Sequence, residues 1–386
     1  MISGPLFLSV LMAINVPASG QPYRDLSLSD TRFLGPSDSD VAPDGHETIR
    51  IGVLGPARSA AGDRLQAAVE IAIEEANRRG GCKGRPYEMV FRSDDGLWGT
   101  GAKQLAALAL EDSVSAIVGG LNGGDAHVAE LATAKLWVPL ITPTASDMTI
   151  DYANVPWVFR IFPRDDLQAR SLIDYGGERG LRRLLVLIEG NREGRTGRRR
   201  LEQAADRAGF GLWGIEEYEA HEMYETKSAA VRDADALLIW GEPTGALELI
   251  RSARADSFDG PVLLAANTLG PELISARESL GELIVAAPYD LGRRWPTELE
   301  RAFRSRTGSP PDPVGIFTYD ATRMIIEAID SAGPSRTAIR SALAEGVHSG
   351  LAGTYRFDGL GGASMAPVLC THRKGRWSRI PTSKVR

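Results

Sequence analysis

The sequence predicts an α/β protein made of two doubly wound lobes, each a parallel sheet with helices on both faces. Short apolar runs of strand length alternate with longer segments whose apolar residues recur at helical spacing. Glycine-rich turns follow several of the runs, as in LNGGDAH after 114–118. The alternation is repeated in the second half of the chain, and 386 residues suffice for two domains.

The first series of strands and helices covers the region up to residue 162. Its apolar runs are too short for buried helices but suit strands covered on both faces. Strands are expected at 48–54, 87–92, 114–118, 138–141 and 157–162. Helices are expected after a loop at 59–63, and at 103–111 and 126–135. This order of elements predicts a parallel sheet.

The second series begins after Pro163 and follows the same pattern. Strands are expected at 183–189, 212–217, 236–240, 261–265 and 283–287, with helices near 197–208, 245–255 and 271–275. A helix at 297–306, a long helix at 316–332 and short closing strands at 355–358, 366–371 and 377–380 complete the chain. Two similar series joined in the middle indicate two lobes with a cleft between them, where small ligands usually bind.

The N-terminus differs from the rest of the chain. Residues 6–16 form an apolar stretch of signal-peptide length, and small residues precede Gln21, so residues 1–20 are expected to be a signal peptide. A disordered N-terminus is the alternative, because no Lys or Arg precedes the stretch. Residues 21–46, rich in Ser, Asp, Pro and Gly, are expected to be a flexible leader. No later apolar run is long enough to span a membrane.

The composition argues against several classes of function. A net charge of −6 gives no support for nucleic-acid binding. Cys82 and Cys370 lie far apart in sequence and are expected to be unpaired, and the histidines have no metal-ligand spacing. Phosphate-cradling and nucleophile-turn motifs are absent from the sequence. We therefore expect neither an enzyme nor a bound metal or cofactor.

Candidate binding residues follow two neighbouring strands of the first series. Gly123 and Gly124 come after 114–118, just before a helix whose first N–H groups lack partners within it. Thr144, Ala145 and Ser146 come after 138–141. The ends of adjacent parallel strands form the edge where open α/β sheets bind ligands, and a helix N-terminus suits an anion. On this stretch alone, a merely structural glycine turn is an equally good interpretation.

Several other residues have alternative interpretations. His127 is expected to be a surface or capping residue rather than a ligand contact. Asp94 and Asp95 are expected to cap a helix rather than act as catalytic carboxylates. The basic run NREGRTGRRR at 191–200 is expected to be a solvated helix face, with an acidic partner as the lesser alternative. Trp240 at a strand end suits ligand stacking and core packing equally.

Taken in order, the segments of the chain resemble the type I periplasmic solute-binding proteins of the leucine/isoleucine/valine-binding branch. The matching segments are IRIGVLGP, AAVEIAIEEANRRGGCKGRPYEMVFRSDD, VSAIVGG, VPLITPTAS, WVFRIFPRDDLQA, YDATRMIIEAI and GLAGTYRFD. The resemblance implies two lobes joined by a three-strand hinge that closes on ligand, with crossovers near 159–162, 287–290 and 347–353. The implied segments are 47–161 and 289–349 for lobe 1, and 162–288 and 350–386 for lobe 2.

The resemblance also suggests which residues line the cleft. Amino-acid-binding relatives hold the ligand carboxylate with a serine after VGG and with the Thr/Ser turn. Thr144 and Ser146 match the second turn, but Gly123, Gly124 and Asp125 stand where the serine is expected. In lobe 2, the neutral Asn267 and Thr268 stand where relatives often have an acid for the ammonium group, and Glu242 is the candidate to supply that charge. Trp98 is the candidate aromatic residue of the cleft.

The resemblance implies a periplasmic, monomeric binding protein that passes a small polar solute, an amino acid or an amide-like compound, to the permease of an ABC transporter. The alternative is a sensor with the same fold and a regulatory role. In either case lobe 1 is expected to hold an anionic or carbonyl end of the solute, and Glu242 a donor or cationic end.

Overall fold

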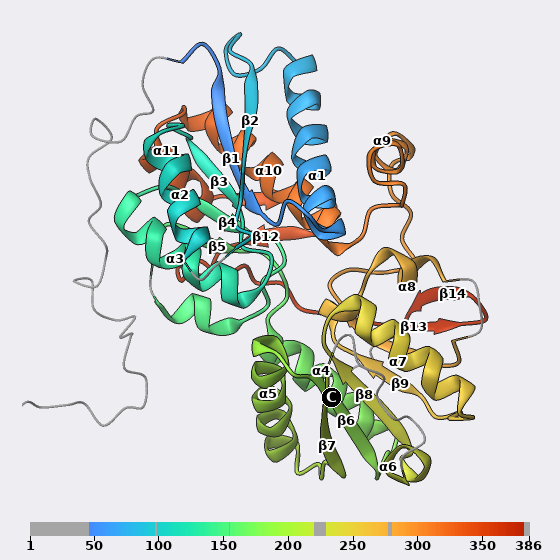
Figure 1. Ribbon diagram of the computed structural model, residues 1–386. Coiled ribbons are helices and arrows are strands. Elements are labelled where there is room, and N and C mark those ends of the chain that lie inside the picture. The colour runs from blue at the N-terminus through green and yellow to red at the C-terminus, as the bar shows by residue number, and fades with distance from the viewer. Residues whose placement is uncertain (1–45, 97–98, 154, 220–228, 277–279, 382–386) are drawn as a thin grey trace, which may run out of the picture.

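The computed structural model describes residues 46–96, 99–153, 155–219, 229–276 and 280–381, and places them in two lobes (Figure 1). The predicted signal peptide, all but the last residue of the predicted leader, and Trp98 lie outside these residues. Among the described helices, none is long and apolar enough to cross a membrane.

Lobe 1 is built on a parallel sheet with the strand order β2-β1-β3-β4-β5. Its strands are β1 Ile49–Gly55, β2 Tyr87–Ser93, β3 Ala116–Gly119, β4 Leu140–Thr142 and β5 Val158–Arg160. Helices α1 Ala60–Arg78 and α10 Pro313–Ala332 cover one face, and α2 Thr100–Leu110 and α3 Gly123–Leu136 cover the other. The lobe also contains α9 Thr297–Thr307, α11 Arg336–Glu345, the 3-10 helix η3 Met148–Ala153 and the hairpin of β11 Val347–Ser349 and β12 Thr354–Arg356.

Lobe 2 is built on a sheet with the order β14-β13-β10-β9-β8-β6-β7. Its parallel strands are β6 Leu184–Glu189, β7 Gly214–Tyr218, β8 Ala236–Trp240, β9 Val262–Leu264 and β10 Leu283–Ala287; β13 Val368–Arg373 and β14 Arg376–Arg379 add an antiparallel edge. Helices α4 Asp165–Glu178 and α5 Arg192–Ala208 pack on one face and α7 Pro243–Ala255 and α8 Pro271–Ser275 on the other. The remaining elements are α6 Ala229–Asp233 and η4 Ala266–Thr268. The predicted α/β fold class with parallel sheets is confirmed.

Four helices, α1, α3, α5 and α10, begin earlier than the apolar periodicity predicts and have a polar cap in front of the first apolar residue. The Ser59 hydroxyl accepts from the Gly62 N–H at 3.0 Å, so α1 occupies most of the expected loop. Asn122 caps α3 and Asn191 caps α5 in the same way, each at 2.9 Å. Gly123 and Gly124 therefore form the first turn of α3 rather than the turn before it.

The third crossover between the lobes lies later than expected. The hairpin of β11 and β12 stays with lobe 1, because the buried Asp320 of α10 accepts from the Leu351 N–H at 2.7 Å and from the Tyr355 hydroxyl at 2.6 Å. The chain reaches the lobe 2 sheet only at β13, after Ala363 has bridged to Phe357. The crossover predicted near 347–353 is therefore wrong, and residues 350–363 lie with lobe 1. The other segment boundaries stay predictions.

Arg160 bonds the first crossover to the segment before the third through its backbone, and its side chain forms a fully buried ion pair with η3. The Arg160 guanidinium, 0% exposed at the end of β5, makes two bonds to the Asp151 carboxylate, at 2.9 and 2.8 Å. The Arg160 backbone accepts from the Ala363 N–H at 2.8 Å and donates to the Gly361 carbonyl at 2.7 Å. The backbone bonds of Arg160 thus join the two crossover segments, and its ion pair joins β5 to η3.

Both cysteines are free and buried, in different lobes. The Cys82 thiol faces the Ile329 carbonyl of α10, and the Cys370 thiol of β13 faces the Tyr289 carbonyl. Burial raises the pKa of Cys370 to about 11.

Candidate functional site

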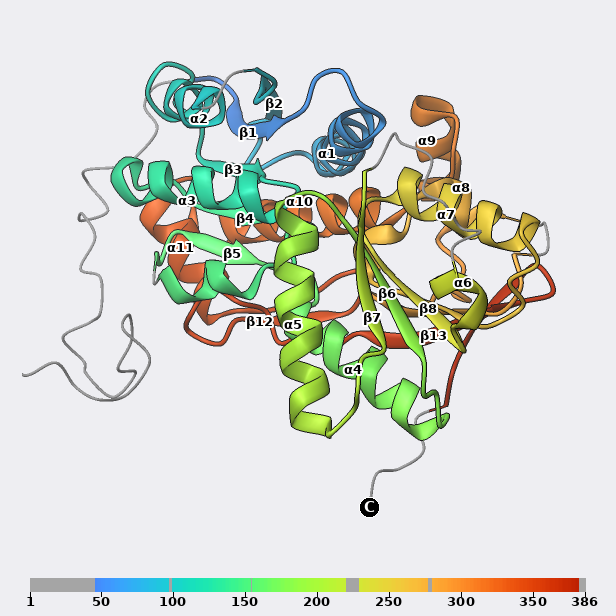
Figure 2. The same cartoon turned by 60° about the horizontal axis from the view of Figure 1, so that its bottom comes forward.

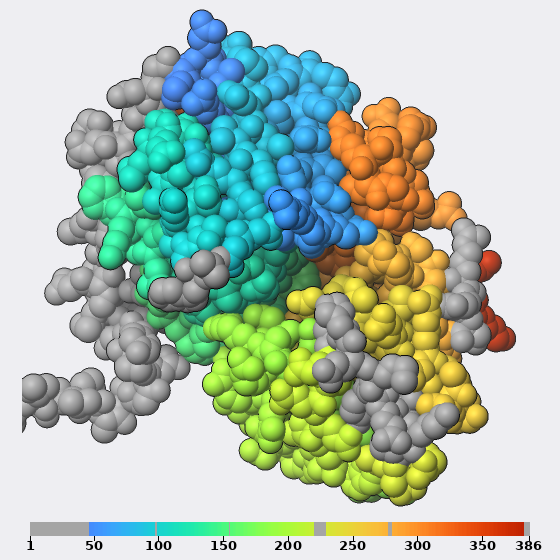
Figure 3. All heavy atoms as spheres, in the orientation of Figure 1, coloured from blue at the N-terminus to red at the C-terminus, as the bar shows by residue number. Residues whose placement is uncertain are grey.

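The two lobes meet where the N-terminus of α3 faces the N-terminus of α5. Figure 2 shows α5 extending from lobe 2 toward lobe 1, where its first turn contacts α3. The Gly123 N–H donates to Glu193 Oε1 at 3.1 Å, and Arg192 Nη1 lies 2.8 Å from Asp147 Oδ2. Since each helix follows a strand, the carboxyl edges of both sheets face one cleft. The space-filling view shows a hollow along this boundary (Figure 3).

The residues predicted on the lobe 1 side lie together at this edge. Thr144 uses its hydroxyl to bond the Leu121 carbonyl at 2.7 Å, which ties the β4 turn to the β3 turn. Ala145 and Ser146 follow in the same turn and are buried. Gly123 and Gly124 face them from the first turn of α3. Whether any of these residues touches a solute stays a prediction.

Glu193 of lobe 2 occupies the N-terminus of α3. Its carboxylate takes the Gly123 N–H, which the helix itself leaves unpaired, at the positive end of the helix dipole. The pKa of Glu193 is raised, chiefly by burial. The Arg192 charge beside Glu193 opposes this rise, and the Asp147 charge adds to it. A β-carbon at Gly123 would lie only 2.7 Å from Arg192 Nη1 and 3.0 Å from Glu193 Oε1, so glycine permits this close approach of the lobes.

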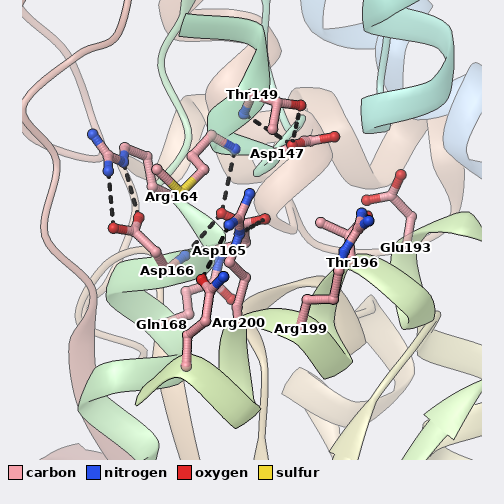
Figure 4. A network of polar contacts seen from close by, with 12 residues as sticks. Asp147, Thr149, Arg164, Asp165, Asp166, Gln168, Glu193, Thr196, Arg199 and Arg200 are labelled. Carbon is pink, nitrogen blue, oxygen red and sulfur yellow. Dashed lines mark hydrogen bonds and ion pairs between the residues drawn. The ribbon is translucent and has the colours of Figure 1, made fainter. Parts of the chain in front are cut away.

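Asp147 belongs to a polar network beside this contact, and Figure 4 shows its bonds to Thr149. Its carboxylate, 1% exposed, accepts from the Thr149 N–H at 2.9 Å and the Thr149 hydroxyl at 2.7 Å, and pairs with Arg192. Burial alone would raise the pKa of Asp147, but the bonds from His127, Thr149 and Arg192 outweigh it and hold the pKa below its usual range. Asp147 therefore stays ionised and fixes Arg192.

His127 belongs to the same network and is not the surface or capping residue expected from the sequence. Its Nδ1 lies 2.9 Å from Glu130 Oε2, and its Nε2 lies 2.9 Å from the Thr149 hydroxyl and 3.4 Å from Asp147 Oδ2. The bonds to Asp147 and Glu130 raise the pKa of His127 to about 9 against the opposing effect of burial. Its imidazolium thus links α3 to the turn after β4.

The basic run at the start of α5 is largely the solvated helix face that was expected, since Arg192, Arg195, Arg198 and Arg199 are exposed, but two of its arginines also make ion pairs outside the run. Arg192 crosses to lobe 1, and Arg200 lies 3.3 Å from the buried Asp165 carboxylate of α4. Asp165 also accepts from the Met148 N–H at 3.2 Å, so it joins η3 of lobe 1 to lobe 2 (Figure 4). Burial raises the pKa of Asp165 to about 6, and Arg200 opposes this rise.

On the lobe 2 side, the predicted residues follow adjacent strands. Glu242, two residues after β8, is exposed, and its N–H donates to Glu189 Oε2 at 2.5 Å. Asn267 lies in η4 after β9, and its buried Oδ1 has no hydrogen-bond partner among the described residues. Trp240 is 1% exposed and packs in the core against α5, where a β-carbon on Gly197 would touch its indole ring. Trp98 lies outside the described residues.

Asp94 and Asp95 do not cap α2 as expected. The residue before α2 is Gly99, which makes no side-chain cap bond. Asp95 instead accepts from the Ala57 N–H at 2.7 Å, which ties the loops after β1 and β2 together. Burial, with the Asp125 and Asp95 charges, raises the pKa of Asp94 to about 6.

Four site residues were missed in the sequence. Arg192 and Glu193 contact lobe 1, while Glu189 and Tyr218 end two strands at the same edge as Glu242. Glu189 and Tyr218 could have been found from the sequence, because Glu189 ends a predicted strand and Tyr218 directly follows another. Strand ends mark the ligand edge of a parallel sheet. No group of His, Cys, Asp and Glu suited to a metal ion occurs in the described parts of the chain.

The fold and the cleft define a two-lobed α/β binding protein, with parallel sheets facing one another across the ligand edge. The model of the family described as periplasmic binding protein matches residues 48–370, and the chain belongs to that family.

Similar proteins come from several bacteria. The Leu/Ile/Val-binding protein homolog 3 of Brucella melitensis is 31% identical over 130 residues, which is 33% of this chain and 35% of that protein. The chain thus matches only about a third of that relative's length. The isoleucine complex of LivJ from Streptococcus pneumoniae has a TM-score of 0.74 at 19% identity, covering 86% of this chain and 99% of LivJ. A Rhodopseudomonas palustris solute-binding protein in complex with 3,4-dihydroxybenzoic acid has a TM-score of 0.75 at 14% identity, covering 88% and 99%.

Proposed function

We propose that this chain is an exported binding protein that captures a small polar solute, from the amino acids and amide-like compounds, and delivers it to the permease of an ABC transporter. The observation that carries this proposal is the contact between the N-termini of α3 and α5, which brings the ligand edges of two parallel sheets to one cleft. Membership of the periplasmic binding protein family supports it. The protein acts in the periplasm as a monomer and catalyses no reaction.

The proposed solute contacts come from both lobes. Lobe 1 contributes the first turn of α3 and the turn after β4; lobe 2 contributes the residues that follow β8 and β9. The residues in these positions are Gly123, Gly124, Thr144, Ala145, Ser146, Glu242 and Asn267. Closure is favoured because a solute that touches both lobes binds the closed form more tightly than the open one.

A thermal-shift screen of amino acids, amides and amines tests the function, because a ligand stabilises the native state according to its concentration over Kd. Ser146→Ala then tests the site: it removes one hydroxyl at the cleft and should weaken binding roughly tenfold, with little change in the stability of the free protein. The matched control is Ser305→Ala, since the Ser305 hydroxyl bonds only within α9. Binding by Ser146→Ala that equals the control would show that the lobe 1 contacts have been misplaced.

A further inference from the structure

Glu189, Tyr218 and Glu242 form a polar cluster at the cleft edge of lobe 2. Glu189 and Tyr218 are paired in register as the last residues of β6 and β7, and Glu242 follows the neighbouring strand β8. Glu189 is 5% exposed, and the Glu242 N–H fixes its Oε2 at 2.5 Å. Two carboxylates therefore converge beside one buried ring.

The Tyr218 hydroxyl lies beside Glu189 in this cluster without a hydrogen-bond partner. Tyr218 is 4% exposed, and its oxygen bonds to nothing among the described residues. A β-carbon on Gly241 would meet this hydroxyl, and it would lie 2.6 Å from Glu189 Oε2. Because a buried hydroxyl without a partner costs free energy, the arrangement points to a group that a bound solute supplies.

The charge of this cluster is negative. Burial raises the pKa of Glu189, and the nearby Glu242 and Glu219 carboxylates raise it further. The same Glu189 and Glu242 charges, after burial, raise the pKa of Tyr218. The arginines at the start of α5 lie across the sheet, since α5 packs with Ile188 whereas Tyr218 packs with Leu187 on the α7 face.

On the lobe 1 wall of the cleft, the N-terminus of α3 is already occupied by a carboxylate of the protein itself. The Glu193 carboxylate takes the Gly123 N–H at the N-terminus of α3, and Asp147 takes Arg192. A carboxylate on the solute would have to displace Glu193 and would lie beside the ionised Asp147. Lobe 1 therefore disfavours a free carboxylate, while lobe 2 favours a positive charge.

We infer that the solute is an organic cation without a free carboxylate, an amine or guanidinium compound whose N–H groups are held by Glu189, Glu242 and the Tyr218 hydroxyl oxygen. This inference rests on the proposed solute-binding function, but it replaces the amino acids in the proposed substrate class by cations that lack a carboxylate. Carboxylates suit ammonium and guanidinium donors, and such charge-assisted bonds are about twice as strong as neutral ones. The buried Glu189 carboxylate and the exposed Glu242 carboxylate, beside an unpaired hydroxyl, give a cation both charge and a third acceptor.

Calorimetry on the protein without its leader compares leucine, leucinamide and isopentylamine, which share an ammonium group and a side chain but differ in the carboxylate. Leucinamide and isopentylamine should bind at least about tenfold more tightly than leucine. Glu242→Gln and Tyr218→Phe should each weaken amine binding about tenfold. Tyr218→Phe should leave the free protein at least as stable as the parent, because it removes a buried hydroxyl that has no partner among the described residues. Glu248→Gln, exposed on α7, is the matched control and should bind like the parent.

Glu193→Ala provides an independent arm, because it frees the N-terminus of α3 and should raise the affinity for leucine. Leucine binding by the parent that equals or exceeds leucinamide binding overturns the inference and leaves the binding function intact. Amine binding that neither Glu242→Gln nor Tyr218→Phe changes also overturns it. If no amino acid, amide or amine stabilises the parent, the proposed function fails with it.

Discussion

Replacing Asp151 by asparagine should lower the free energy of unfolding by about 3–5 kcal/mol. Asparagine keeps the shape of the side chain but removes its charge, so the Arg160 guanidinium would stay buried without a counter-ion. The magnitude follows from burial: Arg160 and Asp151 side chains are 0% and 1% exposed and meet through two bonds at 2.9 and 2.8 Å. Removing one partner of such a pair costs far more than the pair itself contributes.

Urea unfolding followed by circular dichroism measures this loss. The matched control is Glu300→Gln, which neutralises the partner of Arg304 in an i,i+4 pair whose side chains are 53% and 38% exposed. Because water screens that pair, its loss should cost less than about 0.5 kcal/mol. A cost for Asp151→Asn as small as that of the control would refute the reasoning, since it would show that Arg160 is hydrated or paired elsewhere once Asp151 is neutral.

Three further outcomes are expected. The pKa of His127 is about 9 in the folded protein and about 6.5 in the unfolded one. His127 therefore contributes up to about 3 kcal/mol to the free energy of unfolding below about pH 6.5, and this contribution is lost as the pH rises to about 9. His127→Gln should flatten this part of the curve of stability against pH, and an unchanged curve would contradict the shift. Cys82 and Cys370 should react with a thiol reagent slowly in the native protein and as two thiols after denaturation; a single thiol or none would contradict their free state. Gly123→Val should separate the lobes, because its side chain would collide with Arg192 and Glu193. Small-angle X-ray scattering should find a larger radius of gyration than for Gly211→Val, a glycine with open space around it. Equal radii would count against the contact.

The sequence was a good guide to the fold because the strands are sites of nearly complete burial. The runs that became β6, β8 and β10 are buried at every position, so hydrophobicity alone marked them. Helix starts were predicted too late, since Asn122 and Asn191 extend α3 and α5 beyond their apolar stripes. Periodicity detects the packed face of a helix and not its capped, polar first turn.

The candidate site was predictable only where it follows from strand order. Thr144, Ser146, Glu242 and Asn267 come after neighbouring parallel strands, and such strand ends share one edge. The contact of Glu193 with Gly123 has no comparable signal, because it joins residues of different lobes and depends on how the lobes sit. In sequence the same glutamate is one more charge in a basic helical run.

Because Glu193 lies at the N-terminus of α3, its carboxylate competes with dissolved anions for that position. A carboxylate tethered beside the α3 N-terminus has an effective concentration there of the order of millimolar, fixed by the chain and independent of the surrounding solution. Dissolved anions that bind this N-terminus weakly must exceed that concentration before they occupy half of it. Carboxylates that bind the α3 N-terminus no more tightly than Glu193 does, and are present below that concentration, therefore leave Glu193 in place there.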